Sequence, residues 1–414
     1  MASRPGRVNE RTDAPGPLLR RGPRPLLLHL TLAMLRSSGS VAASARWRTD
    51  WPLSSEGTAP LAAAIAAVLA GTGKADPEAF ALTALREALL QDRALIGGIA
   101  AYRSHPWRRD LADPPCRWRE GGSRVLDYGG AGPTVLFIPS LVNRSYVLDL
   151  APGHSMLRFL AANGLHSLLL DWGWPGEVER GFTLTDYIAG RLERSLIAVG
   201  EPLILAGYCM GGLLAVAAAE RRPDLVRGLA LLATPWDFHA GEEERAGAVA
   251  RLLPFLEPAL AIADALPVDA LQALFSLLDP FGVADKYRAF GRLRQDSDRA
   301  RLFVALEDWL NDGIPLAAPV ARECLAGWYG GNTPARGAWR VAGLPVDPGA
   351  LALPTFVAVP GRDRIVPPES AKPLAQAIAG ARLHEPAAGH IGMVAGATAE
   401  AALWRPLLEW ARGV

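Results

Sequence analysis

The chain lacks the patterns that mark disulfide-rich, zinc-protease or nucleic-acid-binding proteins. Its three cysteines stand far apart among 414 residues, so neither a disulfide framework nor a cysteine metal cluster is predicted, and a reducing compartment is favoured. Its seven histidines include no HExxH pair, which excludes that metalloprotease motif. The formal net charge is only +1, and such a balance gives no support to a nucleic-acid partner.

Long apolar runs are also missing. None reaches the roughly 18–20 residues that a membrane-spanning helix needs, so we predict no transmembrane segment. Arginines precede the apolar residues 25–34, a pattern similar to a signal peptide, but His29 and Arg36 interrupt it. We therefore favour a disordered basic leader at residues 1–24, followed by a short helix, over a cleaved signal. Met34 is an alternative start.

Hydrophobic spacing changes its period along the chain. Residues 25–110 show mostly helical spacing, clearest at residues 77–90. Residues 116–118 and 125–128 read as two strands around a glycine turn. Apolar strands and helices then alternate, which predicts a mostly parallel sheet with helices on both faces. The expected strands lie at 134–139, 166–171, 203–206, 228–233, 354–361 and 381–384, and the expected helices at 156–162, 183–199, 369–379 and 398–412.

Residues 206–212 (AGYCMGG) carry the strongest functional signal. They follow an apolar strand and open a helical run, with small residues around one nucleophile. That combination is typical of the nucleophile elbow of α/β-hydrolases, here with Cys209 in the usual place of serine. A lone buried cysteine is more often a small hydrophobic residue, but the glycines around Cys209 favour a nucleophile.

The α/β-hydrolase fold assigns the remaining regions. We predict a catalytic domain over residues 111–414, behind the helical N-terminal region. Residues 239–350 interrupt the strand–helix alternation without a good strand of their own. An insertion of this length is seldom structureless. Because it sits where these folds carry a lid, we interpret it as a helical lid over Cys209.

A nucleophilic cysteine needs a base, and the base needs an orienting partner. In this fold the chain order is nucleophile, acid, histidine. Asp363 follows the strand at 354–361, and His390 lies in what we predict to be a glycine-flanked loop after the last strand. Strand C-terminal ends are where open α/β sheets place ligands. Asp363 could instead be a turn residue or the ion-pair partner of an arginine, with Asp237 as the rival acid.

Other histidines fit this order less well, because their sequence contexts do not match the terminal loop; they are His154, His166 and His239. The oxyanion hole should use the backbone N–H of Met210 and a second N–H from the loop after the first core strand. We place that second donor at Leu141 or Val142.

Cysteine changes the favoured reaction. A thiolate that attacks a thioester exchanges one thioester for another, whereas serine would form a less activated oxygen ester. The acyl group on Cys209 therefore stays energised for an alcohol acceptor. His390 would help to form the attacking thiolate. This favours acyl transfer from a thioester over hydrolysis.

Several segments together resemble the polyhydroxyalkanoate synthases, which polymerise 3-hydroxyacyl-CoA into storage polyester. The elbow looks like their cysteine lipase box, and residues 143–150 (NRSYVLDL) resemble their segment after the first core strand. Residues 171–175 and 181–188 are similar to their class III members, and residues 363–367 and 389–391 match their acid and histidine motifs.

The resemblance implies that Cys209 carries the growing acyl chain and that His390 activates it. Asp363 would support His390 or help to activate the incoming 3-hydroxyl. It implies no metal or redox cofactor, since the CoA thioester is the substrate. It leaves open a homodimer or a second synthase subunit, and suggests a cytoplasmic protein associated with polyester granules.

Two other functions stay open at this stage. A thioesterase, esterase or polyester depolymerase would use the same elbow and triad. A catalytically dead relative acting as a granule-binding accessory protein would not need them. The helical region with Trp47 and Trp51 is our candidate for oligomerisation or granule attachment.

Overall fold

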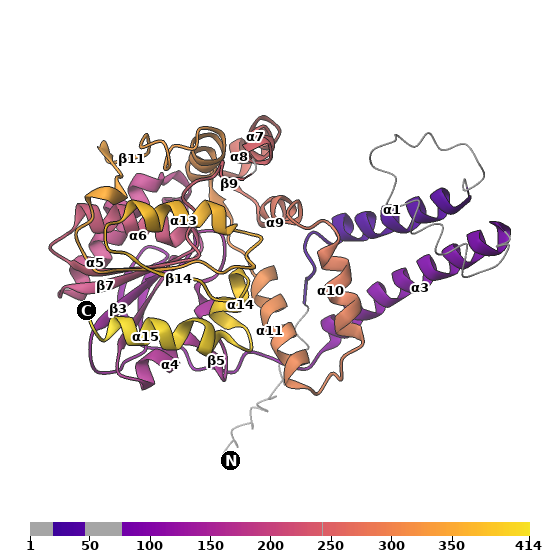
Figure 1. Cartoon of the computed structure of the whole chain (residues 1–414), viewed down its shortest axis with the longest axis horizontal. Coiled ribbons are helices and arrows are strands. Elements are labelled where there is room, and N and C mark those ends of the chain that lie inside the picture. The colour runs from indigo at the N-terminus through magenta and orange to yellow at the C-terminus, as the bar shows by residue number, and fades with distance from the viewer. Residues whose placement is uncertain (1–19, 46–76, 242) are drawn as a thin grey trace, which may run out of the picture.

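A central eight-stranded sheet organises the chain from residue 116 onward (Figure 1). The computed structural model describes residues 20–45, 77–241 and 243–414. The strands, in their order across the sheet, are β1 (Cys116–Glu120), β2 (Ser123–Asp127), β6 (His166–Asp171), β3 (Thr134–Ile138), β7 (Leu203–Tyr208), β8 (Val226–Leu232), β13 (Thr355–Ala358) and β14 (Arg382–His384). Strands from β6 to β14 pair in parallel, and the β1–β2 hairpin joins β6 antiparallel. The predicted mostly parallel sheet is confirmed.

Both faces of this sheet are covered, which explains its uninterrupted apolar strands. In β3, Val135 and Phe137 pack into one core, and Leu136 and Ile138 pack into the other. A strand buried on both faces has no position left for polar side chains, so it reads as a continuous hydrophobic run.

Two helical layers supply the cover (Figure 1). One face carries α4 (Met156–Ala162), α14 (His390–Ala395), η6 (Glu400–Trp404) and α15 (Arg405–Ala411). The other carries η3 (Asp186–Leu192), α5 (Glu193–Val199), α6 (Met210–Arg221) and α13 (Pro368–Ala377). Short elements join them: η1 (Ser145–Leu148), β4 (Asp149–Ala151), β5 (His154–Ser155) and η2 (Glu179–Gly181).

The predicted insertion between β8 and β13 is mainly helical. Its elements are α7 (Glu243–Ala250), α8 (Leu253–Ala263), β9 (Ala265–Leu266), α9 (Val268–Ser276), α10 (Gly282–Gly291), α11 (Asp298–Asn311), β10 (Leu316–Ala317), α12 (Ala318–Arg322), η4 (Glu323–Gly330), β11 (Arg340–Val341), β12 (Leu344–Pro345) and η5 (Pro348–Ala350). Its strands are two residues long, and they pair antiparallel as β9 with β10 and β11 with β12. By length and composition alone, the helical stretch Glu243–Ala263 could cross a membrane, and the described residues hold no second such helix.

The N-terminal region packs against the insertion. Helices α1 (Leu26–Ala45) and α3 (Pro77–Ser104) project away from the sheet beside α10 (Figure 1). Their buried side chains form a third core with α10 and α11. Most of the expected leader, and Trp47 and Trp51, lie outside the described residues. Expected disorder is wrong for residues 20–24, because Arg20 is buried against Asp308 of α11. The domain boundaries stay predictions.

Candidate active site

Cys209 stands at a sharp turn between β7 and α6. Its backbone has φ 55° and ψ −128°, a conformation that costs an L-residue energy and persists only when its surroundings hold it. The Cys209 N–H donates to the Leu232 carbonyl at 2.8 Å, and the Gly212 N–H donates to the Cys209 carbonyl at 2.9 Å. These bonds hold the strained turn that presents a nucleophile in this type of elbow.

The glycines of the elbow are required by close packing. A Cβ at Gly207 would lie 2.4 Å from the Gly212 Cα, and one at Gly211 would lie 2.0 Å from the Ile138 carbonyl oxygen. A Cβ at Gly212 would lie 1.9 Å from the Thr234 Oγ1. No side chain fits at these distances, so the strand, the turn and the helix can approach this closely only with glycine.

His390 and Asp363 meet beside this turn. His390 Nδ1 lies 2.6 Å from Asp363 Oδ2, and both side chains are buried. The other carboxylate oxygen, Oδ1, accepts the backbone N–H groups of Ile365 at 2.8 Å and Val366 at 2.9 Å. The acid is therefore both a turn residue and the partner of the histidine. This contact at Nδ1 leaves His390 Nε2 for Cys209, the neighbouring group that acts on the pKa of the imidazole.

One sequence expectation about His390 is wrong. His390 does not lie in a loop but is the first residue of α14. Gly389 before it is extended, with φ −94° and ψ 175°, and the helix begins directly afterwards. The Tyr208 hydroxyl donates to the His390 carbonyl at 3.3 Å. This bond holds the backbone of His390 in addition to the bond that Asp363 makes with its side chain.

The charge state of His390 follows from its neighbours. Burial by itself would lower the pKa of His390, but the Cys209 sulfur and the Asp363 carboxylate raise that pKa to about 10. The imidazole therefore favours its cationic form at neutral pH. A cation at this position stabilises a cysteine thiolate, the reactive form of the side chain.

The alternative residues lie in other surroundings. Asp237 accepts a hydrogen bond from Asn332 Nδ2 at 2.8 Å and does not pair with His390. His166 is bonded to Asp127, and His239 lies against the Tyr329 carbonyl. Within the described part of the chain, no group of three or more His, Cys, Asp and Glu residues could hold a metal ion.

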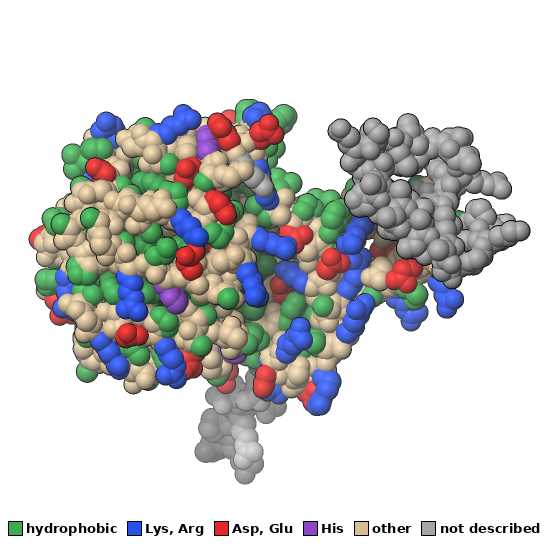
Figure 2. Space-filling model, in the orientation of Figure 1, with side chains coloured by type: hydrophobic (Ala, Val, Ile, Leu, Met, Phe, Trp, Pro, Cys, Tyr) green, Lys and Arg blue, Asp and Glu red, His purple; other side chains and the backbone are tan. Residues whose placement is uncertain are grey.

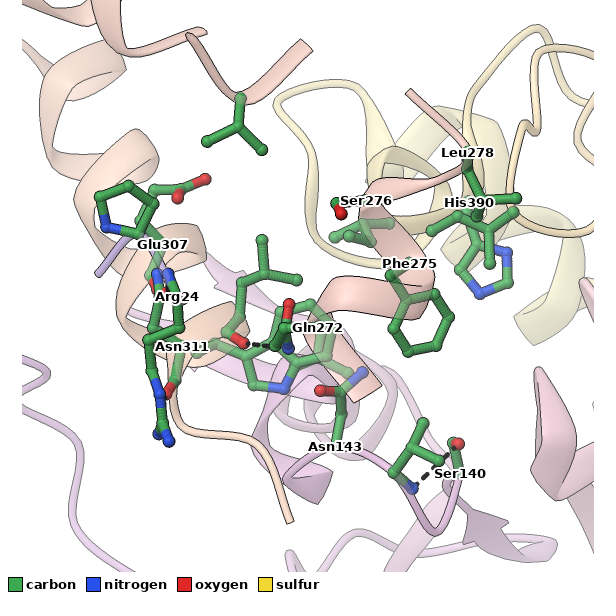
Figure 3. Close-up of a pocket in the computed structure, with 18 of the residues that line it drawn as sticks. Arg24, Ser140, Asn143, Gln272, Phe275, Ser276, Leu278, Glu307, Asn311 and His390 are labelled. Atoms are coloured by element: carbon green, nitrogen blue, oxygen red, sulfur yellow. Dashed lines mark hydrogen bonds between the residues drawn. The ribbon is translucent and has the colours of Figure 1, made fainter. Parts of the chain in front are cut away.

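A cavity of about 340 Å³ opens in front of Cys209 and His390. The insertion contributes Phe275 and Leu278 to its lining, and the loop after β3 contributes Val142. Figure 3 shows Phe275, Leu278 and His390 close together on one side of this pocket. The predicted lid therefore contributes part of the wall above the elbow.

The expected oxyanion donors differ in their placement. Met210 is the first residue of α6, so its N–H has no acceptor within the helix. Val142 lines the cavity, and its N–H donates to Ser140 Oγ at 3.3 Å. Leu141 is only 4% exposed and is not part of the cavity lining. Because the Val142 N–H already has Ser140 Oγ as its acceptor, the choice between Leu141 and Val142 as the second donor stays a prediction.

One segment quoted for the family resemblance, residues 143–150, touches the insertion. The Trp309 Nε1–H donates to the Arg144 carbonyl at 2.7 Å. The Tyr146 hydroxyl donates to Asp312 Oδ2 at 3.3 Å, and Arg144 lies 3.6 Å from the same carboxylate. These contacts tie the end of α11 to the segment after β3, which includes part of the cavity wall.

Residues 133–397 match the family described as "alpha/beta hydrolase fold". The chain belongs to that family. Relatives of this α/β-hydrolase include the protein "Poly(3-hydroxyalkanoate) polymerase subunit PhaC" of Haloferax mediterranei, which is 31% identical over 71% of this chain and 62% of the relative. The protein of the same name from Allochromatium vinosum is 28% identical over 67% of this chain and 79% of the relative. The protein of that name from Haloarcula marismortui is 29% identical over 70% of this chain and 62% of the relative. The chain thus spans less than two thirds of the Haloferax and Haloarcula proteins.

Sequence reasoning missed part of the cavity of this α/β-hydrolase. Pro23, Arg24 and His29 line it together with Cys209. No motif marks these residues, since Pro23 and Arg24 lie in a segment whose composition predicts disorder and His29 lies in an apolar helical run.

Proposed function

We propose that this α/β-hydrolase is an acyltransferase that polymerises 3-hydroxyacyl-CoA into polyhydroxyalkanoate and releases CoA. The observation that carries the proposal is a cysteine at the elbow, beside a buried histidine that is bonded to a carboxylate. The similarity to polyhydroxyalkanoate polymerases supports the same substrate class.

The first half-reaction loads the enzyme. The Cys209 thiolate attacks the thioester carbonyl, and the N–H group of Met210, together with that of Leu141 or Val142, stabilises the oxyanion. The C–S bond to CoA breaks, and the departing sulfur takes its proton from His390. The product is a thioester on Cys209 that keeps the acyl group activated.

The second half-reaction extends the chain. His390, now neutral, accepts the proton of a 3-hydroxyl group while its oxygen attacks the acyl thioester on Cys209. An ester bond forms, the C–S bond breaks, and Cys209 returns as a thiolate. Asp363 has one oxygen on two backbone N–H groups and the other on His390. This arrangement supports a role in orienting His390 over direct contact with the hydroxyl.

The test is incubation with 3-hydroxybutyryl-CoA, with free CoA and products measured together. We expect CoA release together with polyester of increasing mass, and neither with Cys209→Ala. Free 3-hydroxybutyrate without polymer would instead establish a thioesterase. Full function of Cys209→Ala in cells would support the accessory role.

We further propose that the protein works in the cytoplasm at the surface of polyester granules. We also propose that it assembles either as a homodimer or with a second synthase subunit, and that its reaction uses no metal or redox cofactor. Sedimentation of the purified protein, alone and with candidate subunits from neighbouring reading frames, tests its assembly.

A further inference from the structure

A segment outside the hydrolase domain borders the reaction cavity. Pro23, Arg24 and His29 line the same cavity as Cys209 and His390. They precede residue 133, where the family match begins. Figure 3 shows Arg24 with Glu307 and Asn311 along one side of the pocket, and His390 with Leu278 along the other.

Arg20 anchors the start of this segment. Its Nε donates to Asp308 at 2.7 Å, and its two terminal nitrogens donate to the carbonyls of His105 and Trp107. Its side chain is 6% exposed and its guanidinium lies over the Tyr102 ring. A buried guanidinium with three acceptors holds a fixed geometry that lysine cannot reproduce.

A second set of contacts follows directly. The Arg24 N–H donates to Asn311 Oδ1 at 2.9 Å, and its Nε donates to Asp269 at 2.8 Å. A Cβ at Gly22 would lie 2.4 Å from Asn311 Nδ2, so the backbone rests directly on α11. The Arg103 Nε–H donates to the Gly22 carbonyl at 3.0 Å. The segment is therefore attached to both α3 and α11.

His29 completes this side of the cavity. Its Nε2 lies 3.0 Å from the Arg24 carbonyl, and therefore donates to it. Burial lowers the pKa of His29, so the ring is neutral and Nδ1 is an acceptor. Within the described residues, Nδ1 has no hydrogen-bond partner. The ion pair between Lys286 and Glu307, at 2.6 Å, lines the cavity beside it.

We propose that residues 20–29 form a wall of the substrate cavity and that Arg24 and His29 set how tightly acyl thioesters bind before Cys209. The identity of the ligand rests on the proposed function, whereas the wall itself does not. A wall that contacts ground state and transition state alike changes KM and leaves kcat nearly constant.

The first readout is alkylation of Cys209 by a bulky maleimide in the full-length protein, followed on the Cys209 peptide by mass spectrometry. His29→Trp places a larger ring in the cavity, and we expect about tenfold slower labelling. Arg20→Met frees the segment, and we expect about tenfold faster labelling. Each change corresponds to roughly 1.4 kcal/mol. Arg36→Met is the matched control, since Arg36 pairs with Asp285 outside the cavity lining and is half-exposed.

The second readout is steady-state CoA release from 3-hydroxybutyryl-CoA. We expect His29→Trp to raise KM about tenfold with kcat within about threefold, and Arg36→Met to match the wild type. If wild type releases CoA but the labelling rates and KM of both variants equal those of wild type, the inference is wrong. If wild type releases no CoA, the proposed function fails and the labelling rates still decide the wall. If His29→Trp fails to fold, Arg24→Ala replaces it, with faster labelling expected.

Discussion

Replacing Asp363 by asparagine separates its two contacts, one with the backbone of its own turn and one with His390. One oxygen accepts two backbone N–H groups, from Ile365 and Val366, and the other contacts His390 Nδ1. An asparagine has only one oxygen to share between these positions. Turning its NH₂ group toward the backbone would leave two buried N–H groups without acceptors. Each such group costs about 1–3 kcal/mol.

The asparagine oxygen therefore stays on the backbone, and its NH₂ faces His390 Nδ1. Because that nitrogen must now accept, the imidazole proton moves to Nε2, which faces Cys209. A neutral imidazole that already carries its proton on Nε2 cannot accept another one there from the Cys209 thiol or the substrate hydroxyl. We expect CoA release to fall by about 10²–10⁴, the range seen when an orienting carboxylate is lost from a catalytic triad.

Alkylation of Cys209 by iodoacetamide across pH 5–10 gives a second assay. In the wild type, the pKa of His390 near 10 keeps a cation beside the sulfur of Cys209, and a neighbouring cation favours fast alkylation at pH 7. In Asp363→Asn, which loses this cation, we expect slower alkylation at pH 7 and a rate that increases as the pH rises toward 10. Asp237→Asn is the control, since Asp237 bonds Asn332 and not His390. If Asp363→Asn released CoA within about threefold of the wild-type rate and kept the wild-type alkylation profile, the orienting role of Asp363 would be excluded.

Three further changes test other parts of the structure. Cys209→Ser should fold normally but release CoA at least about 100-fold more slowly, because a hydroxyl is a weaker nucleophile at neutral pH; equal rates would contradict the thiolate mechanism. Gly212→Ala places a Cβ 1.9 Å from Thr234 Oγ1, and should lower the free energy of unfolding by about 1–3 kcal/mol in urea titrations. Burial raises the pKa of Glu220 to about 7, so the native state holds this proton more tightly than the unfolded state does. Glu220 therefore makes stability fall as pH rises from about 4.5 to 7, and Glu220→Gln should be more stable than wild type at pH 8 and closer to it at pH 4; the reverse order would exclude this explanation.

Local patterns predicted most elements of the sheet. The helix at Met156–Ala162 and the strand at His166–Asp171 have the expected bounds, because continuous apolar runs between turn residues leave few alternatives. His390 was misplaced into a loop because one extended glycine is enough to begin a helix there. Glycines near a histidine are compatible both with a loop and with the start of a helix, so the sequence does not distinguish the two.

The elbow could be predicted from the residues of one short segment, because its requirements are local. Cys209 needs a strand before it, a helix after it and glycines where backbones touch, and all of these are adjacent in the chain. Packing between distant elements selected Asp363 over Asp237 as the acid that lies 2.6 Å from His390, since both acids follow strands of the same sheet. It also decided that residues 20–29 border the cavity, because their contacts with Asp308 and Asn311 join positions nearly 290 residues apart. Such long-range contacts depend on packing between elements, and no short pattern in the chain records them.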